Sequence, residues 1–385
     1  MDLRLPSLKI ENYRTFKSLD IKKVGRVNLL VGKNNVGKTS VLEAVRLWAE
    51  QGSLSCLLDI LGARDETGFA NSIAKLSGKN DYPLLGATCL FRDYPYLGSE
   101  ISPIAIGSPC KYLLLGFYQI VSSLTETGSL GSISDGEFEL SIHFSPEPSL
   151  HEAYSHYHSP LEEIRSLPLL ADKTEIKRKI AVDQNRSNRF NDKITPMVFV
   201  PASAAQKQFS LWDAIAATGK ERIVIDGLRL IEPDIDEIRL IERKNSTSQT
   251  KERLPVAWMG KHSRRIPLQS LGDGTVRLFE LMLALVNAEN GILLLDEMEN
   301  GLHHSVQKKV WKTFFQMAKK LDVQIIATTH SWDCVKTFQE AAAENEPGDG
   351  VLIKLYRPKE SEDVRASCLY GEDLNCVIEA DMEVR

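Results

Sequence analysis

Long apolar runs, cysteine pairs and internal repeats are all missing from this chain of 385 residues. No run approaches the roughly 18 apolar residues of a membrane helix, which excludes a membrane-spanning segment. The six cysteines form no CxxC pair, so we expect neither a structural zinc site nor a disulfide framework. Without a heptad run, a long coiled-coil arm is excluded as well. The N-terminal segment lacks the apolar core of a signal peptide, so we expect a cytoplasmic protein with no membrane partner.

A strong net charge is also missing, because 47 Lys and Arg residues face 52 Asp and Glu residues, a formal charge of −5. This balance excludes a protein that coats nucleic acid with its whole surface, although it allows a local basic patch. Residues 173–193 form a strongly basic segment, which fits either a solvated face or a contact with DNA. The length predicts two domains, or one large domain with an insertion.

A glycine-rich loop lies between a predicted strand at Val27–Val31 and a predicted helix at Ser40–Trp48. The loop matches the pattern G-x-x-x-x-G-K-[ST] at every position, which is typical of a phosphate-binding loop. Backbone N–H groups of such a loop point at phosphates, and the helix N-terminus favours negative charge. We expect Lys38 to reach the β- and γ-phosphates of ATP, and Thr39 to supply a hydroxyl to Mg²⁺. The residues predicted to bind the nucleotide here are Gly32, Asn34, Asn35, Gly37, Lys38, Thr39 and Ser40.

Two further buried strands are predicted to end in polar side chains. Ile292–Leu295 is followed by Asp296 and Glu297, and Val323–Thr328 leads to His330. We expect Asp296 to hold Mg²⁺ through its water shell, and Glu297 to act as the general base. His330 is predicted to contact the γ-phosphate or the attacking water, the alternative being a hydrogen-bonded histidine at a sheet edge. Together with Lys38, Glu297 and His330 are the predicted catalytic residues.

A second glycine-containing loop runs from Leu268 to Thr275, directly before a predicted helix. Ser270, Gly272 and Gly274 lie in this loop, where the free N–H groups of the helix start suit an anion. Taken alone, the pattern predicts a helix N-terminus and nothing more.

The order of these motifs resembles the ABC-type ATPases of the SMC, RecF and OLD (overcoming lysogenization defect) group. Residues 299–303 stand at the D-loop of that group, and Ile10–Phe16 is similar to its first strand and turn. Arg14 stands where some members place a residue near the phosphates. The resemblance implies a composite site, in which the second glycine-containing loop of one subunit closes over the nucleotide held by Lys38 of another. It therefore implies a homodimer or higher homo-oligomer joined head to head.

Several departures narrow this resemblance. We identify no convincing Q-loop glutamine. The Ser-Leu-Gly-Asp-Gly signature differs from the Leu-Ser-Gly-Gly-Gln of transporters, and a long insertion separates Thr39 from Ser270, which argues against a transporter motor. Too few residues follow His330 for the Toprim metal domain of OLD nucleases, so we do not expect the chain itself to be a nuclease.

We expect an α/β fold, namely an ABC-type P-loop ATPase head with a mixed sheet and flanking helices. Residues 1–50 and 195–385 are predicted to form the ATPase core, and 51–194 an irregular insertion. Short strands are predicted within the insertion at Gly86–Phe91 and Phe138–Phe144.

The resemblance implies an ATP-hydrolysing switch that dimerises head to head. The switch would act on DNA or on a separately encoded nuclease or toxin, in genome maintenance or antiphage defence. The alternative is an accessory subunit whose ATP binding regulates such a nuclease or toxin without contact to DNA.

Overall fold

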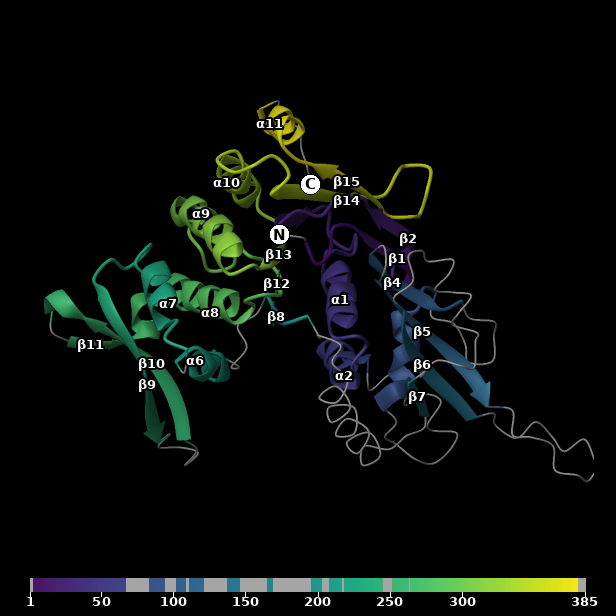
Figure 1. Cartoon of the computed structure of the whole chain (residues 1–385), viewed down its shortest axis with the longest axis horizontal. Helices are drawn as coiled ribbons and strands as arrows, with labels where there is room; N and C mark the ends of the chain where they lie inside the picture. The colour runs from purple at the N-terminus through teal and green to yellow at the C-terminus, as the bar shows by residue number, and fades with distance from the viewer. Residues whose placement is uncertain are drawn as a thin grey trace, which may run out of the picture.

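Three sheets and the helices packed on them make up the described part of the chain (Figure 1). None of the described helices combines the length and the hydropathy that crossing a bilayer requires. The computed structural model describes residues 3–66, 83–93, 102–108, 111–120, 137–145, 165–168, 195–202, 208–216, 218–244, 251–262 and 264–379.

The central sheet has six strands in the order β15–β14–β3–β13–β12–β8, and all but β15 run parallel. Parallel strands point their carboxyl ends to the same edge of a sheet. The polar residues that follow β3, β12 and β13 therefore meet at one edge, as the sequence predicts. The strands are β3 (Val27–Val31), β8 (Met197–Val200), β12 (Ile292–Leu295), β13 (Gln324–Thr328), β14 (Gly350–Tyr356) and β15 (Arg365–Leu369).

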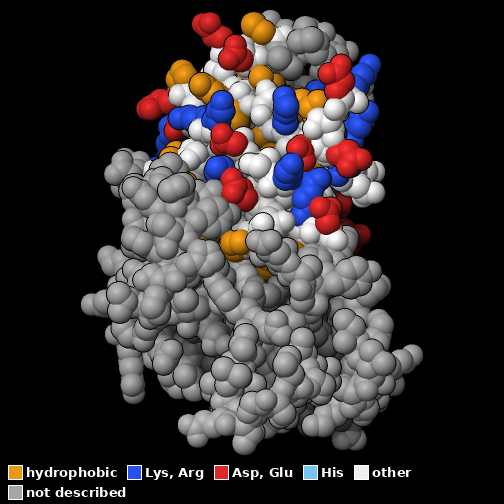
Figure 2. Space-filling view, turned by 90° about the vertical axis from the view of Figure 1, so that its right-hand side faces the viewer, with side chains coloured by type: hydrophobic (Ala, Val, Ile, Leu, Met, Phe, Trp, Pro, Cys, Tyr) orange, Lys and Arg blue, Asp and Glu red, His pale blue; other side chains and the backbone are white. Residues whose placement is uncertain are grey.

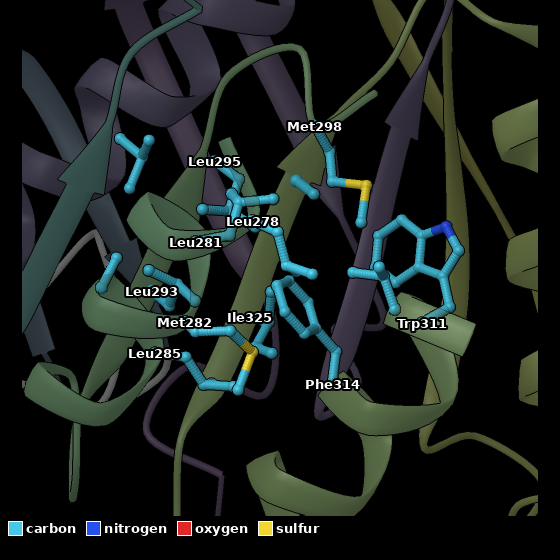
Figure 3. Close-up of a cluster of buried hydrophobic side chains, with 14 of the residues drawn as sticks. Leu278, Leu281, Met282, Leu285, Leu293, Leu295, Met298, Trp311, Phe314 and Ile325 are labelled. Atoms are coloured by element: carbon cyan, nitrogen blue, oxygen red, sulfur yellow. The ribbon is translucent and has the colours of Figure 1, made fainter. Parts of the chain in front are cut away.

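Alternate residues of the central strands face two separate cores, because side chains alternate across a strand. In β12, Ile292 and Leu294 face the core that contains α1 and α2, whereas Leu293 and Leu295 face α8 and α9. Figure 3 shows the second core, with side chains of α8 and Phe314 of α9 packed over β12 and β13. Burial on both faces explains the uninterrupted apolar runs in these strands. The helices are α1 (Lys38–Ala49), α2 (Leu54–Ala63), α8 (Asp273–Asn287), α9 (His304–Lys320) and α10 (Trp332–Ala342).

The second sheet has six antiparallel strands in the order β2–β1–β4–β5–β6–β7. Four of them come from residues that we expected to be irregular, and they extend the sheet that β1 and β2 begin. The strand predicted at Phe138–Phe144 is confirmed, but the one at Gly86–Phe91 is wrong, because Pro83–Leu90 forms the 3₁₀-helix η2. A short apolar run without alternation does not distinguish a strand from a helix. The strands are β1 (Leu8–Tyr13), β2 (Phe16–Ile21), β4 (Ile104–Ser108), β5 (Lys111–Ile120), β6 (Glu137–Ser145) and β7 (Arg165–Pro168).

A three-stranded antiparallel sheet, β11–β10–β9, lies at the left of Figure 1 beside α6, α7 and α8. Its inner face is covered, since Arg253 pairs with Asp213 of α6 at 2.6 Å and Ala257 and Met259 join the second core. The strand β11 leads through the 3₁₀-helix η4 directly into α8, so this sheet ends at the second glycine-containing loop. The elements are α6 (Gln208–Ala216), α7 (Glu221–Leu228), β9 (Ile235–Lys244), β10 (Lys251–Met259), η3 (Gly260–His262), β11 (Arg264–Pro267) and η4 (Leu268–Leu271); α11 (Glu372–Glu379) follows β15.

Candidate nucleotide site

The phosphate-type loop connects β3 to α1, and two of its positions require glycine. Gly37 has φ of +103°, and a Cβ there would lie 2.6 Å from the ring of Phe16. At Gly32, φ is +149° and a Cβ would lie 2.4 Å from the carbonyl oxygen of Leu355. Since no side chain caps the N-terminus of α1, its first N–H groups are available to an anion.

Lys38 lies inside this loop, with only 6% of the residue exposed. Its Nζ donates hydrogen bonds to the carbonyl oxygens of Gly32 at 2.7 Å and Lys33 at 3.2 Å. Burial lowers the pKa of Lys38, although the carboxylates of Asp296 and Glu297 act in the opposite direction. A cation held in this way is placed to exchange backbone carbonyls for phosphate oxygens.

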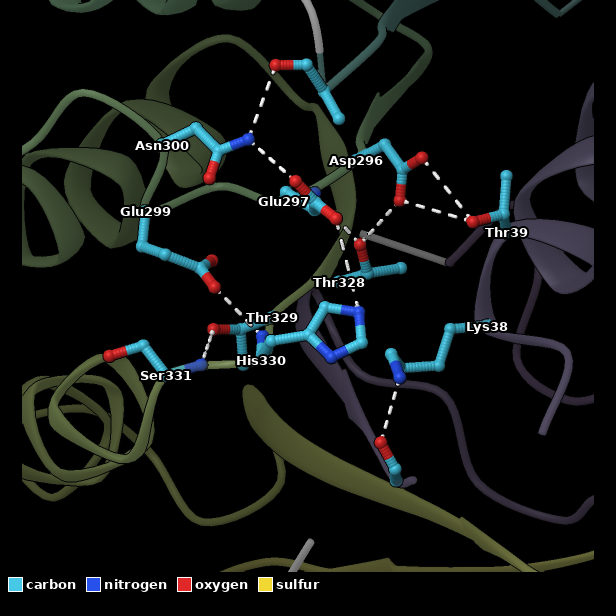
Figure 4. Close-up of polar contacts among 12 residues, drawn as sticks. Lys38, Thr39, Asp296, Glu297, Glu299, Asn300, Thr328, Thr329, His330 and Ser331 are labelled. Atoms are coloured by element: carbon cyan, nitrogen blue, oxygen red, sulfur yellow. Dashed lines mark hydrogen bonds and ion pairs between the residues drawn. The ribbon is translucent and has the colours of Figure 1, made fainter. Parts of the chain in front are cut away.

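Thr39, Asp296 and Thr328 bring α1, β12 and β13 together through hydroxyl and carboxylate oxygens (Figure 4). The hydroxyl of Thr39 lies 3.3 Å and 3.5 Å from the two carboxylate oxygens of Asp296. Thr328 donates to Asp296 Oδ1 at 2.6 Å. A hydroxyl and a carboxylate are hard oxygen ligands, so Thr39 and Asp296 fit Mg²⁺, which keeps several waters and binds few protein ligands.

Glu297 follows β12 in a left-handed backbone conformation, with φ of +48°. Non-glycine residues in that region store strain, which surrounding contacts must maintain and which is frequent at functional sites. The N–H of Glu297 donates to Thr328 Oγ1 at 2.9 Å, and Asn300 Nδ2 donates to Glu297 Oε2 at 2.6 Å. Hydrogen bonds therefore hold Glu297 both at its backbone and at its carboxylate.

His330 follows β13 and directs its ring toward Glu297 (Figure 4). Its Nε2 lies 3.9 Å from Glu297 Oε1, and its backbone N–H donates to Glu299 Oε1 at 2.8 Å. The side chain of His330 is 42% exposed, so the imidazole remains accessible from solvent. This position fits a contact with a phosphate or a water better than it fits a histidine packed at a sheet edge.

Other predicted residues of the loop do not join this cluster. Asn34 and Asn35 are exposed at the tip of the loop, and Asn35 has φ of +60°. Ser40 is buried, and its hydroxyl accepts a hydrogen bond from Arg64 Nη2 at 3.5 Å. A contact between the nucleotide and these three side chains stays a prediction.

The structure places Arg14 in an ion-pair network with Glu43 and Glu66. Its guanidinium lies 2.7 Å from Glu43 Oε2 and donates to both carboxylate oxygens of Glu66 at 2.7 Å and 3.1 Å. Burial alone would lower the pKa of Arg14, but Tyr13, Glu66 and Glu43 together raise it. A contact with phosphate would require Arg14 to exchange one of these partners.

The second glycine-containing loop is not assembled with the cluster around Lys38. Ser270 and Gly272 are exposed, and a Cβ at Gly272, whose φ is +101°, would meet nothing within 4 Å. Gly274 lies deeper, where a Cβ would come within 3.0 Å of the carbonyl oxygen of Gly301. The loop thus presents an open surface at the start of α8.

Three residues with clear positions at the site were missed from the sequence: Thr328, Asn300 and Arg277. Thr328 is the first threonine of the Thr-Thr-His run, and Asn300 lies in the predicted D-loop. Both residues therefore lie within motifs from which they could have been predicted. Arg277 gave no signal, because an arginine within an amphipathic helix is ordinarily read as exposed. It is 6% exposed and donates to the backbone carbonyl oxygens of Asp296 and Glu297.

Comparison with known proteins links both halves of this site to ATPases. The model of a family described as "AAA ATPase domain" matches residues 3–80. A second model, described as "AAA domain, putative AbiEii toxin, Type IV TA system", matches residues 225–333. The first contains Lys38 and Thr39, and the second contains Asp296, Glu297 and His330.

Individual relatives agree with these matches. An ATP/GTP phosphatase from Helicobacter pylori is 20% identical over 386 residues, which cover 97% of this chain and 98% of that protein. The DNA replication and repair protein RecF of Clostridioides difficile is 46% identical over 43 residues, covering 11% of this chain and 12% of RecF.

Comparison of structures also found solved SMC heads. An SMC head bound to the C-terminal winged-helix domain of ScpA has a TM-score of 0.47 and 12% identity, and the match covers 95% of this chain and 98% of that one. The SMC head domain from Thermotoga maritima has a TM-score of 0.41 and 14% identity, and the match again covers 95% of this chain and 98% of that one.

The site and the family matches together define the class of protein. The chain is an ATPase, and two of its segments match the models of AAA-type domains. The α/β P-loop fold expected from the sequence is confirmed.

Proposed function

We propose that this ATPase is a nucleotide-driven switch whose heads close on each other around ATP. The observation that carries the proposal is the division of the site into two parts. Lys38, Thr39, Asp296 and Glu297 are assembled at one sheet edge, whereas the loop at Ser270 is exposed. A site divided in this way is complete when the loop of a second copy covers the nucleotide.

Within one head, the residues of this chain divide the work of hydrolysis. Lys38 and the loop N–H groups bind the β- and γ-phosphates, and Thr39 and Asp296 hold Mg²⁺. When bound, the ion neutralises charge that develops on the phosphate oxygens. Glu297 orients a water and takes its proton as the water oxygen attacks the γ-phosphorus and the bond to ADP breaks. His330, 3.9 Å from that carboxylate, steadies the water or the phosphate.

A mixing experiment tests the contribution in trans. Lys38→Ala removes the phosphate contact, and Ser270→Arg blocks the signature surface, so each variant alone is expected to lack turnover. A mixed dimer holds one intact composite site, so an equimolar mixture should regain measurable turnover, at most about a quarter of the wild-type rate. Full activity of Ser270→Arg alone, or no recovery on mixing, would contradict a composite site.

We propose that the switch acts on DNA or on a separately encoded effector, in genome maintenance or antiphage defence. One feature of the outer face of β9–β11 supports a nucleic-acid contact: Arg239, Trp258 and Arg265 line a hollow of about 240 Å³ there. Glu237 also lines it and pairs with Arg239 at 2.7 Å, so a phosphate would compete with that carboxylate. Figure 2 shows a different face, where acidic and basic side chains are interspersed over the described part. The basic segment 173–193 lies outside the described residues.

The second candidate function is an accessory subunit that regulates a toxin or nuclease without DNA. The family description that names a toxin–antitoxin system supports it. Retention of DNA that falls steeply with salt would favour the first function, because contacts to phosphates release counterions. A partner that co-purifies in equal amounts at high salt, without DNA retention, would favour the second.

A further inference from the structure

Arg277 connects the helix that follows the signature loop to the backbone around Glu297. It lies in α8, and its Nη2 donates to the carbonyl oxygens of Asp296 at 3.2 Å and Glu297 at 3.3 Å. Its Nη1 donates to the carbonyl oxygen of Pro201 at 3.2 Å. Only 6% of the residue is exposed, and these charge-assisted hydrogen bonds are partly buried.

The two carbonyls that Arg277 holds belong to the peptide groups on either side of Glu297. That residue has φ of +48°, a conformation that costs on the order of 1–3 kcal/mol and persists only where surrounding contacts maintain it. The hydrogen bond from the Glu297 N–H to Thr328 anchors it to β13. Arg277 supplies the corresponding anchor to α8, so the orientation of Glu297 depends on where α8 lies.

Backbone packing reinforces this connection. A Cβ at Gly274, in the first turn of α8, would lie 3.0 Å from the carbonyl oxygen of Gly301. A Cβ at Gly301, whose φ is +74°, would lie 3.4 Å from Arg277 Cβ. Because little space separates them, the start of α8 and the segment after β12 must move together.

We propose that Arg277 is a positioning residue that sets the geometry of Glu297 according to the position of the signature loop. The inference rests on the proposed function, since it takes Glu297 as the general base. Docking of Ser270 and Gly272 on the nucleotide of the partner head would fix α8. Arg277 would then hold the backbone of Glu297 in its own head in the orientation that activates water. Each head would thus hydrolyse ATP fastest when its own signature loop is engaged.

A double-mutant cycle tests whether Arg277 acts through Glu297. Arg277→Met keeps the length of the side chain but removes its donors, and it should lower kcat about 30- to 100-fold with KM changed less than about threefold. Arg277→Lys keeps one charged donor and should recover at least about tenfold of that loss. In a Glu297→Gln background, Arg277→Met should lower the residual rate less than about threefold, because the group it positions is already disabled.

Arg26 offers a matched control, since it is also a buried arginine, 9% exposed. It donates to the carbonyl oxygen of Ala318 at 3.5 Å and pairs with Asp322 at 3.1 Å, with no contact to Glu297. Arg26→Met should lower the unfolding midpoint while leaving kcat within about twofold. If Arg277→Met does not fold, the cycle is run with Arg277→Lys.

The outcomes of the cycle distinguish the positioning role of Arg277 from the proposed role of Glu297 as general base. An equal loss from Arg277→Met in the wild-type and Glu297→Gln backgrounds would overturn the positioning role and leave the proposed function intact. The same holds if Arg26→Met lowers kcat as much as Arg277→Met does. Wild-type turnover by Glu297→Gln would overturn the proposed general base, and this inference with it.

Discussion

Replacing Thr328 by valine tests how the carboxylates at the end of β12 are held. The Thr328 hydroxyl donates to Asp296 Oδ1 at 2.6 Å and accepts from the N–H of Glu297 at 2.9 Å. Valine keeps the shape of the side chain but provides neither interaction. We therefore expect a loss of stability together with a loss of turnover.

The magnitude follows from these two hydrogen bonds. A bond to a charged group contributes about 1.5–3 kcal/mol, and an unpaired buried N–H costs about 1–3 kcal/mol. Since Thr328 is 1% exposed, the added methyl group of valine returns roughly 1 kcal/mol. The free energy of unfolding should fall by about 1.5–5 kcal/mol, and kcat by about 10- to 100-fold as Glu297 loses its anchor to β13.

Thr329→Val is the matched control, because Thr329 is equally buried and accepts its hydrogen bond from the N–H of Ser331. Urea unfolding measures the stability of both variants, and ATP turnover under conditions where both are folded measures kcat. The control should lose about 1 kcal/mol and keep its turnover. Wild-type turnover by Thr328→Val, or equal losses in both variants, would refute the reasoning.

Three further substitutions test the phosphate-type loop and the central sheet. Gly37→Ala forces a left-handed alanine against an aromatic ring, so calorimetry should show nucleotide affinity reduced more than about tenfold and stability lowered by at least about 2 kcal/mol. Lys38→Met removes a buried ammonium whose desolvation offsets its two hydrogen bonds, so stability should change by less than about 1 kcal/mol while affinity falls about 100-fold. Although burial alone would raise it, hydrogen bonds from Arg4 and Arg26 lower the pKa of Asp322 from its ordinary value of 3.8. These two ion pairs stabilise the fold above about pH 4, and their contribution is lost as the pH falls through the lowered pKa of Asp322. In Asp322→Asn, the free energy of unfolding should therefore fall less steeply as the solution is acidified.

The assembled part of the site could be predicted because its signals are local. Ile292–Leu295 is an apolar run buried on both faces, and the residues after it reach a crevice that parallel strands create. The loop from Gly32 to Thr39 specifies its own backbone, since Gly32 and Gly37 have positive φ at positions where a Cβ would clash. The order strand, loop and helix was therefore enough to bring Lys38 and Asp296 together.

Contacts that depend on distant pairing could not be predicted. The strand β4 (Ile104–Ser108) lies in a stretch rich in Gly, Ser and Pro, and its pairing with β1 spans nearly a hundred residues. Gly107 looks like a loop residue, yet a Cβ there would lie 2.3 Å from the carbonyl oxygen of Lys111 across the β4–β5 hairpin. The role of Arg277 likewise depends on how α8 packs beside β12, which a helical pattern does not reveal.

The central claim, a nucleotide site completed by a second head, is tested most directly by the mass of Glu297→Gln in solution. Light scattering with and without ATP and Mg²⁺ measures it, because a variant that binds but hydrolyses slowly accumulates the closed state. We predict one chain of 43.1 kDa without ATP and about twice that mass with it. A mass that saturating, bound ATP leaves unchanged would contradict the account.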